Sequence, residues 1–369
     1  MPAHVTAFLA SLGLLLHPSA EATPPERTLL VDPIDLVAGR ETPGNPDLAL
    51  VLEGIEYRFS TPDHKAAFEH DPARYQVADG GACGRMGPLS GLGDARRYAV
   101  HDGRIFFFAS DGCREGFLKD PTAHIETDDE MPFGSHEQVL QGRATLDKAV
   151  AWAGGAERLR TLSTFRATSA REEKQGETLW TVTNETFFAF PASSYQREAW
   201  NESWFSTCAT PDGGVMASSR GAERIADSRT RAFRRAVARW PVVLLKARAD
   251  GSPATDCPGF VAIGDGSGTL EGTPVEFVRV WLNGAASRLT IDAATGRLLR
   301  LDYHGRDSSM RVGDVVRTFT EFATIEGLTL PTAYTVTLDG KDLPRAGASL
   351  DTFEINPAPA PGLFDVPAW

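Results

Sequence analysis

An internal repeat constrains this chain more than any other feature of its sequence. A shift of 49 residues brings six pairs of identical residues into register, and it also aligns Tyr57 with Phe106. The identical pairs are Val51 and Val100, Gly54 and Gly103, Phe59 and Phe108, Phe68 and Phe117, Asp71 and Asp120, and Pro72 and Pro121. Alternating aromatic residues predict a half-buried strand, and the segment after them predicts a short helix with one inward Phe. The repeat therefore predicts a small α+β unit that is used twice.

The second copy contains an ordered pattern of aromatic strand, cysteine, phenylalanine and Asp-Pro. It reads Phe108-Ala-Ser-Asp-Gly-Cys113-Arg-Glu-Gly-Phe117-Leu-Lys-Asp120-Pro121. This pattern resembles the YHS domain, a family of small metal-associated modules, and we place a tandem YHS-like domain at residues 28–127. The family's opening, Asp-Pro-x-Cys-Gly-Met, is divided between Asp32-Pro33 in the first copy and Cys83-Gly84-Arg85-Met86 in the second. The Tyr-His-Ser triplet is absent, and His64 stands where the second copy has Cys113.

The cysteines of this domain suggest a metal site. Cys83, Met86 and Cys113 offer two thiols and a thioether, soft donors that suit Cu(I), and Zn(II) is an option if an imidazole such as His64 joins them. We therefore predict a copper or zinc site of Cys83, Met86, Cys113 and His64. A disulfide or thiol pair of Cys83 and Cys113 without a metal is the slightly favoured alternative, because paired cysteines of exported proteins more often form disulfides.

The first residues predict export. Residues 7–16, AFLASLGLLL, have the length of the apolar region of a signal peptide and are too short to span a bilayer. The small-residue pattern Ala20-Glu21-Ala22 fits a peptidase site. We expect a signal peptide at residues 1–22 that is cleaved after Ala22, and a periplasmic or secreted protein.

A second domain is expected at residues 141–369, after an acidic linker at 128–140. Its first helix is predicted from an apolar stripe, Leu146, Ala149, Val150 and Ala153, with Thr145 as N-cap and Gly154-Gly155 as the stop. Six β-rich segments follow, at residues 180–190, 275–282, 289–292, 298–303, 317–322 and 330–338. Turn pairs such as Asn283-Gly284 separate them, which predicts an antiparallel meander.

A basic segment interrupts these strands. Residues 220–248 contain nine Arg or Lys residues against Glu223 and Asp227, and Phe233, Val237, Trp240 and Leu244 share one helical face. Such a helix can lie on an anionic membrane surface. The favoured interpretation is one long core-packing helix whose arginines pair with acidic residues of the rest of the chain.

The second domain contains two motifs besides this order of helices and strands. They are Asp292-Ala-Ala-Thr-Gly296-Arg-Leu and a tail of the form Asn-Pro, Phe, Pro. Together they resemble the periplasmic lipoprotein-carrier superfamily. The resemblance implies an open half-barrel of antiparallel strands that holds an acyl chain or another apolar ligand under helices. The fold class is therefore α+β, a small duplicated module plus a larger antiparallel half-barrel. The aromatic residues expected to line the cavity are Trp180, Phe187, Phe190, Trp240, Phe277 and Trp281.

The two remaining cysteines, Cys208 and Cys257, lie in loop-like segments. In an oxidising compartment we expect them to form a disulfide. It would close a loop of about 50 residues and stabilise the fold by roughly 4 kcal/mol in the chain-entropy model.

No catalytic motif was found for hydrolases, metalloproteases or nucleotide-binding enzymes. Gly264-Asp-Gly266-Ser-Gly268 has the look of a phosphate loop but is interpreted as a hairpin turn. The net charge of −12 argues against nucleic acid as a partner.

The sequence thus favours a non-enzymatic exported protein that binds an apolar molecule or lipid and carries a thiol-bearing YHS-like module. The alternatives are a periplasmic metal or redox protein and, less favoured, a hydrolase of envelope lipids.

Overall fold

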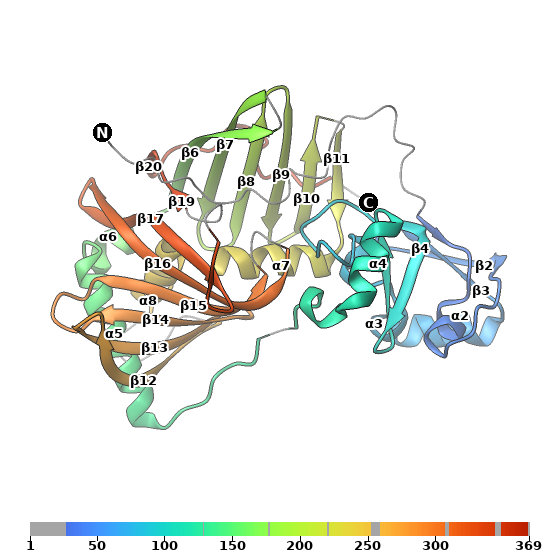
Figure 1. Cartoon of the computed structure of the whole chain (residues 1–369), viewed down its shortest axis with the longest axis horizontal. Coiled ribbons are helices and arrows are strands. Elements are labelled where there is room, and N and C mark those ends of the chain that lie inside the picture. Colours follow the sequence, from blue (N-terminus) through green and yellow to red (C-terminus); the bar gives the residue numbers. More distant parts are fainter. Residues whose placement is uncertain are drawn as a thin grey trace.

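The computed structural model describes residues 27–127, 129–175, 178–219, 221–251, 259–306, 310–343 and 348–367, in two parts (Figure 1). The expected signal peptide and Cys257 lie outside these residues. No helix among the described residues is long and apolar enough to cross a membrane.

The first part contains the duplicated unit. Its first copy consists of β1 (Thr28–Leu29), α1 (Pro33–Val37), β2 (Asn45–Leu52), β3 (Ile55–Phe59), α2 (Pro62–His70) and α3 (Pro72–Tyr75). Its second copy consists of η2 (Ala78–Gly81), β4 (Asp94–His101), β5 (Arg104–Phe108), α4 (Asp111–Lys119) and η3 (Pro121–His124). The last four elements of the second copy begin and end 49 residues after their counterparts. The duplication that the repeat predicts is confirmed.

Each copy closes its core with three aromatic rings. In the first copy the Phe68 ring from α2 lies 4.7 Å from Tyr57 and 5.2 Å from Phe59. In the second copy the Phe117 ring from α4 lies 4.9 Å from Phe106 and 5.2 Å from Phe108. All six side chains are buried. The repeat therefore preserves the packing of the rings as well as the order of elements.

The second part contains two antiparallel sheets. The first has the order β11-β10-β9-β8-β7-β6-β20, and the second has β12-β13-β14-β15-β16-β17-β18, with β19 paired to β17. The strands of the first sheet are β6 (Thr164–Gln175), β7 (Thr178–Ala189), β8 (Ser193–Trp200), β9 (Ser203–Thr210), β10 (Gly213–Ser218), β11 (Gly221–Ile225) and β20 (Thr352–Ile355). Those of the second are β12 (Phe260–Leu270), β13 (Thr273–Leu282), β14 (Ala285–Asp292), β15 (Leu298–Arg306), β16 (Val312–Ile325), β17 (Leu328–Leu338), β18 (Lys341–Asp342) and β19 (Ala348–Ser349). The predicted α+β class with large antiparallel sheets is confirmed.

The helices of the second part are α5 (His136–Trp152), α6 (Ala156–Arg160), α7 (Asp227–Ala238) and α8 (Pro241–Asp250). One buried cluster joins both sheets to these helices: it contains Phe165 and Phe188 of the first sheet, Leu245 of α8, and Leu289 and Leu301 of the second sheet. The predicted hairpin is confirmed, because Leu289 and Leu301 face each other across β14 and β15. The two sheets therefore share a single core.

The first helix of this part begins earlier than predicted. Helix α5 starts at His136, where Ser135 and Gln138 form a capping box. Thr145, the expected N-cap, is buried inside the helix and donates a hydrogen bond to Glu276. The helix includes residues 136–140 of the expected linker 128–140, and it ends before Gly154 as expected.

Two other local predictions are wrong. The basic segment is not one helix, because β11, α7 and α8 divide it and the break falls at Trp240 and Pro241. The glycine-rich segment 264–268 is not a hairpin turn but lies within β12, where the pairing with β13 shifts at a bulge. Glycine suits this bulge, because Gly266 has a φ of 87°.

Four basic side chains of the same segment are buried: Arg229, Arg239, Lys246 and Arg248. Arg239 pairs with Asp129 at 2.9 Å and with Glu126 at 3.5 Å, and Arg248 pairs with Asp147 at 2.9 Å. Pairing with acidic residues is thus confirmed. The segment does not form the continuous exposed basic face that a membrane-surface helix requires.

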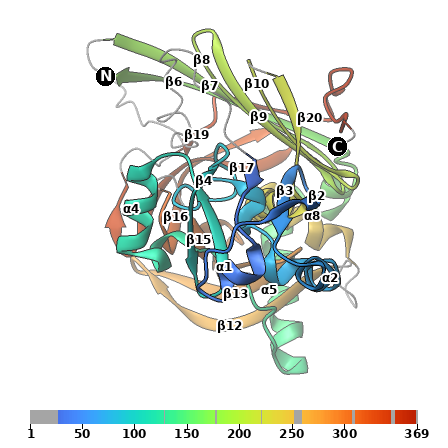
Figure 2. The same ribbon diagram turned by 90° about the vertical axis from the view of Figure 1, so that its right-hand side faces the viewer.

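The first part lies at the open end between the two sheets, as both views show (Figures 1 and 2). Arg229 of α7 makes a buried contact between the parts. Its guanidinium donates to the backbone oxygens of Pro88 at 2.8 Å and Ser90 at 2.6 Å. Burial lowers the pKa of Arg229 to about 10, so the side chain is still charged at neutral pH.

We predict that Arg229→Met lowers the free energy of unfolding by about 2–4 kcal/mol, because two buried carbonyl groups lose their donor. Urea denaturation followed by tryptophan fluorescence measures the change. The exposed Arg231→Met, two residues along α7, is the matched control and should change stability by less than about 0.5 kcal/mol. Equal stability of the two variants would contradict the structural importance of this contact.

Candidate functional site

The second copy brings two thiols together. Cys83 follows η2, and Cys113 lies in the first turn of α4, where the hydroxyl of Ser110 caps its amide at 3.2 Å. Both cysteines are unpaired and buried, and their thiols share a hydrogen bond. Met86 belongs to the same buried cluster. The structure thus places three of the four predicted metal ligands in one cluster.

The hydrogen bond between the thiols makes them chemically unequal. The Cys83 thiol donates to Cys113 and, with the Ser110 hydroxyl and the charge of Arg85, holds the pKa of Cys113 below its usual value. The pKa of Cys83 is raised, first by the same hydrogen bond and then by burial. Cys113 is therefore the group that carries the negative charge, at a helix N-terminus that stabilises it.

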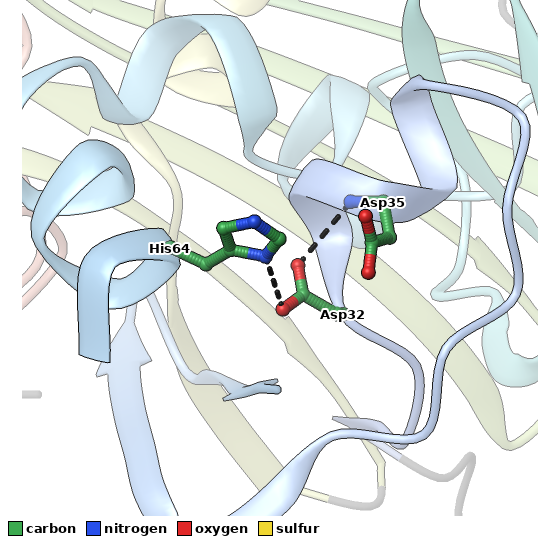
Figure 3. Close-up of side chains that lie close together, drawn as sticks. All are labelled: Asp32, Asp35 and His64. Carbon is green, nitrogen blue, oxygen red and sulfur yellow. Dashed lines mark hydrogen bonds and ion pairs between the residues drawn. The ribbon is translucent and has the colours of Figure 1, made fainter. Parts of the chain in front are cut away.

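The fourth predicted ligand, His64, lies in the other copy. Its Nδ1 lies 2.8 Å from Oδ2 of Asp32, and a dashed line marks this contact in Figure 3. His64 stands in the first turn of α2 as Cys113 stands in that of α4, and Thr61 caps it as Ser110 caps Cys113. Asp32 accepts the amide of Ser60, as Cys83 accepts that of the equivalent Ala109. The Asp32–His64 pair is therefore the counterpart of the thiol pair.

Among the described residues, Asp32, Asp35 and His64 are the one group of three or more His, Cys, Asp or Glu side chains whose possible ligand atoms all lie within 4.8 Å of one another. The hydrogen bonds explain this cluster without an ion. Asp32 accepts from the amides of Ile34, Asp35 and Ser60, from the Ser60 hydroxyl and from His64. A carboxylate has about four lone-pair positions, so Asp32 has none to offer a cation.

Burial alone would raise the pKa of Asp32, but the hydrogen bonds from Ser60 and His64 outweigh it and the pKa is lowered. Asp32 was not singled out in the sequence as a partner of His64. The two residues are far apart along the chain, and no local pattern connects them. The opening Asp-Pro was the available signal, since Asp32 caps α1 directly before Pro33.

A second candidate site is an apolar cavity of about 130 Å³ between the two sheets. Its walls come from β6, β7 and β8 of the first sheet, from β16 and β17 of the second, and from α7 and α8. The apolar wall includes Phe165, Ala236, Trp240, Phe319, Leu330 and Tyr334. Arg317 is the one charged residue in the wall, and it donates to the Tyr303 hydroxyl at 2.9 Å.

Only one of the six predicted cavity residues, Trp240, lines this cavity. Phe187 packs against Phe364 of the tail at 6.0 Å, and Phe190 packs against Phe188 at 6.1 Å. Phe277 stacks on the guanidinium of Arg288 at 3.9 Å.

Trp281 and Phe277 share the face of β13 opposite to the buried Val278 and Val280, and Trp281 donates to the backbone of Asp129. Trp180 is half-buried on β7 and is not part of the wall. The lining aromatics of β16 and β17 were missed, because alternation does not reveal which face of a strand turns inward.

Cys208 is buried on β9, and burial raises its pKa to about 12. A thiol with so high a pKa is a poor nucleophile at neutral pH. The expected disulfide with Cys257 involves a residue outside the described ranges and stays a prediction.

No family model and no curated protein sequence matches the chain. Several solved structures match about three fifths of it at low identity. A DUF1329 family protein from Desulfovibrio piger has 14% identity and a TM-score of 0.37 over 61% of this chain and 97% of that one. A LolA superfamily protein from Nitrosomonas europaea has 10% identity and a TM-score of 0.38, with coverage of 61% and 97%. A domain described as that of an outer membrane lipoprotein-sorting protein, from Vibrio parahaemolyticus, has 9% identity and a TM-score of 0.37, with coverage of 61% and 96%.

At TM-scores below 0.5, these similarities carry no inference about the function of this chain.

We predict that Cys83→Ala raises the pKa of Cys113 by at least about one unit, because the variant lacks the hydrogen bond that contributes most to lowering it. As the pH falls, the Cys113 thiolate should then be protonated earlier in the variant than in the wild type. The ultraviolet absorbance of the thiolate, followed through a pH titration, measures the midpoint. Cys208→Ala serves as the control, and a midpoint that is the same in all three proteins would refute the thiol–thiol hydrogen bond.

Proposed function

We propose that this protein is an exported, non-enzymatic binding protein whose second part holds an apolar ligand between its two sheets. The observation that carries the proposal is the cavity beside Trp240, Phe319 and Leu330. Protein interiors are normally filled, so a cavity of this size with an apolar wall is a site for an apolar guest. An engineered apolar cavity of about 150 Å³ in another protein binds benzene.

The polar groups in the wall support a ligand with one polar end. Ser169, Asn184, Thr186 and Gln196 line the side formed by the first sheet beside Phe165, whereas Trp240, Phe319 and Tyr334 lie on the other sides. Arg317 adds a single positive charge. This combination suits an acyl chain better than a wholly apolar molecule, since a few polar groups in an apolar pocket fix the orientation of a ligand.

Binding can be tested by displacement of the dye N-phenylnaphthylamine and by native mass spectrometry of protein purified from the periplasm. We predict that Ala236→Trp weakens dye binding at least about tenfold, because the indole fills the cavity from α7. Phe277→Ala removes an aromatic residue from the outer face of β13 and should bind as the wild type does. Equal binding by a folded Ala236→Trp variant would refute the assignment of the site.

A second candidate function, Cu(I) binding at the thiol pair, is favoured by two adjacent buried thiols of which one has a lowered pKa. Cys83 and Cys113 would hold the ion as soft donors, with the Met86 thioether as a third. Zn(II) is less well supported. It takes four ligands, and among the described residues no His, Asp or Glu joins the two thiols to form a metal-binding group.

We predict that protein loaded with Cu(I) retains about one equivalent of copper, and that Cys113→Ser and Cys83→Ser retain none. His64→Gln should retain the metal, because His64 pairs with Asp32 in the other copy. Elemental analysis combined with thiol counting measures both. Absence of copper from the wild type, with Cys83 and Cys113 blocked as a disulfide, would leave the first part a structural module.

A further inference from the structure

One wall of the apolar cavity does not belong to the second part. Leu89 comes from the first part, from the loop that follows Cys83, and it lines the cavity together with Ala236 and Trp240. The cavity as it stands is only large enough for a benzene-sized guest. A longer acyl chain needs more room than this, and Leu89 is the wall residue that comes from a different part of the chain.

The residues next to Leu89 are held by buried hydrogen bonds. Arg229 of α7 binds the backbone oxygens of Pro88 and Ser90, one on each side of Leu89. Within the loop, the hydroxyl of Ser90 donates to the backbone oxygen of Gly87 at 2.7 Å. Leu89 is thus positioned by a few polar contacts of its neighbours, and these are the contacts that must break when the loop moves.

On the other side of the same loop lies a polar cavity of about 150 Å³. Pro88 lines it, as do Ala232 and Arg235 of α7, whereas Leu89 and Ala236 line the apolar cavity. Neighbouring residues of the loop and of the helix therefore face different cavities. The pair of residues Pro88 and Leu89 separates the two.

The polar cavity has the charges of an anion site. Three arginines line it, Arg104, Arg231 and Arg235, against two acids. Glu126 is paired with Arg239 at 3.5 Å and Asp79 with Arg104 at 3.9 Å, so each acid already faces a basic partner and Arg231 and Arg235 add positive charge. Ser228, in the first turn of α7, also lines the cavity. The first amide of this helix, that of Asp227, is already bound by Glu53 at 2.8 Å, so the positive charge of the cavity comes from its arginines.

We propose that withdrawal of Leu89 joins these two cavities into one site for an amphiphile, with its acyl chain between the sheets and its anionic head group beside the arginines. The first part then acts as a removable wall of the ligand site. This inference rests on the proposed function, since it names the ligand class of the same apolar cavity.

Two probes of equal chain length separate the contributions of chain and charge: dodecanoate, which is anionic, and dodecanol, which is neutral. Titration calorimetry on the full chain measures both affinities. We expect dodecanoate to bind more tightly than dodecanol.

Arg231→Gln should weaken the affinity for dodecanoate at least about threefold and leave the affinity for dodecanol unchanged. Leu89→Ala should strengthen both probes about fivefold, because no wall has to be withdrawn. Leu118→Ala, an exposed leucine of α4, is the matched control.

Hydrogen exchange provides a second measurement, since the amides of residues 86–92 should exchange faster when dodecanoate is bound. Binding that is unchanged by Leu89→Ala and Arg231→Gln, but is lost in Ala236→Trp, would overturn this inference and leave the proposed function intact. If neither dodecanoate nor dodecanol bound to the wild type or to Leu89→Ala, both this inference and the proposed function would be overturned.

Discussion

The hydrogen bonds of Arg229 to the backbone of Pro88 and Ser90 connect the two parts of this protein. A buried guanidinium is expensive to desolvate, and it is tolerated here because two carbonyl oxygens accept from it at 2.8 and 2.6 Å. The loop that it holds begins at the thiol pair and carries Leu89 into the cavity wall. Arg229 therefore links the position of this loop to the wall of the cavity and to the surroundings of Cys83.

The duplicated unit was predictable because its information is local. Identical residues at a fixed shift specify the same strands, the same helices and the same ring packing, and Phe68 and Phe117 occupy equivalent places. The start of α5 was also predictable in principle, because Ser135 and Gln138 form a capping box that the sequence contains. The apolar stripe from Leu146 to Ala153 identifies the buried face of the helix but not its first turn.

The cavity could not be predicted in the same way. Alternation shows that Phe277 and Trp281 share one face of a strand, but the direction of that face depends on how the sheet curves over the helices. Leu89 lines the cavity because the two parts are in contact, and no local sequence pattern specifies their relative position. Likewise, the pairing of His64 with Asp32 depends on tertiary structure, although each residue lies in a motif that was noted.

The two copies of the repeat use one structural position for two chemically different pairs. In each, a buried acceptor receives a backbone amide and shares a proton with a residue in the first turn of a helix. The carboxylate and imidazole of the first copy can only exchange that proton. The two sulfur atoms of the second copy can also lose electrons to an oxidant and become covalently joined. An oxidising change in the surroundings would therefore alter the covalent structure of the second copy. The first copy, which has no thiol at the equivalent position, would keep its structure under the same conditions.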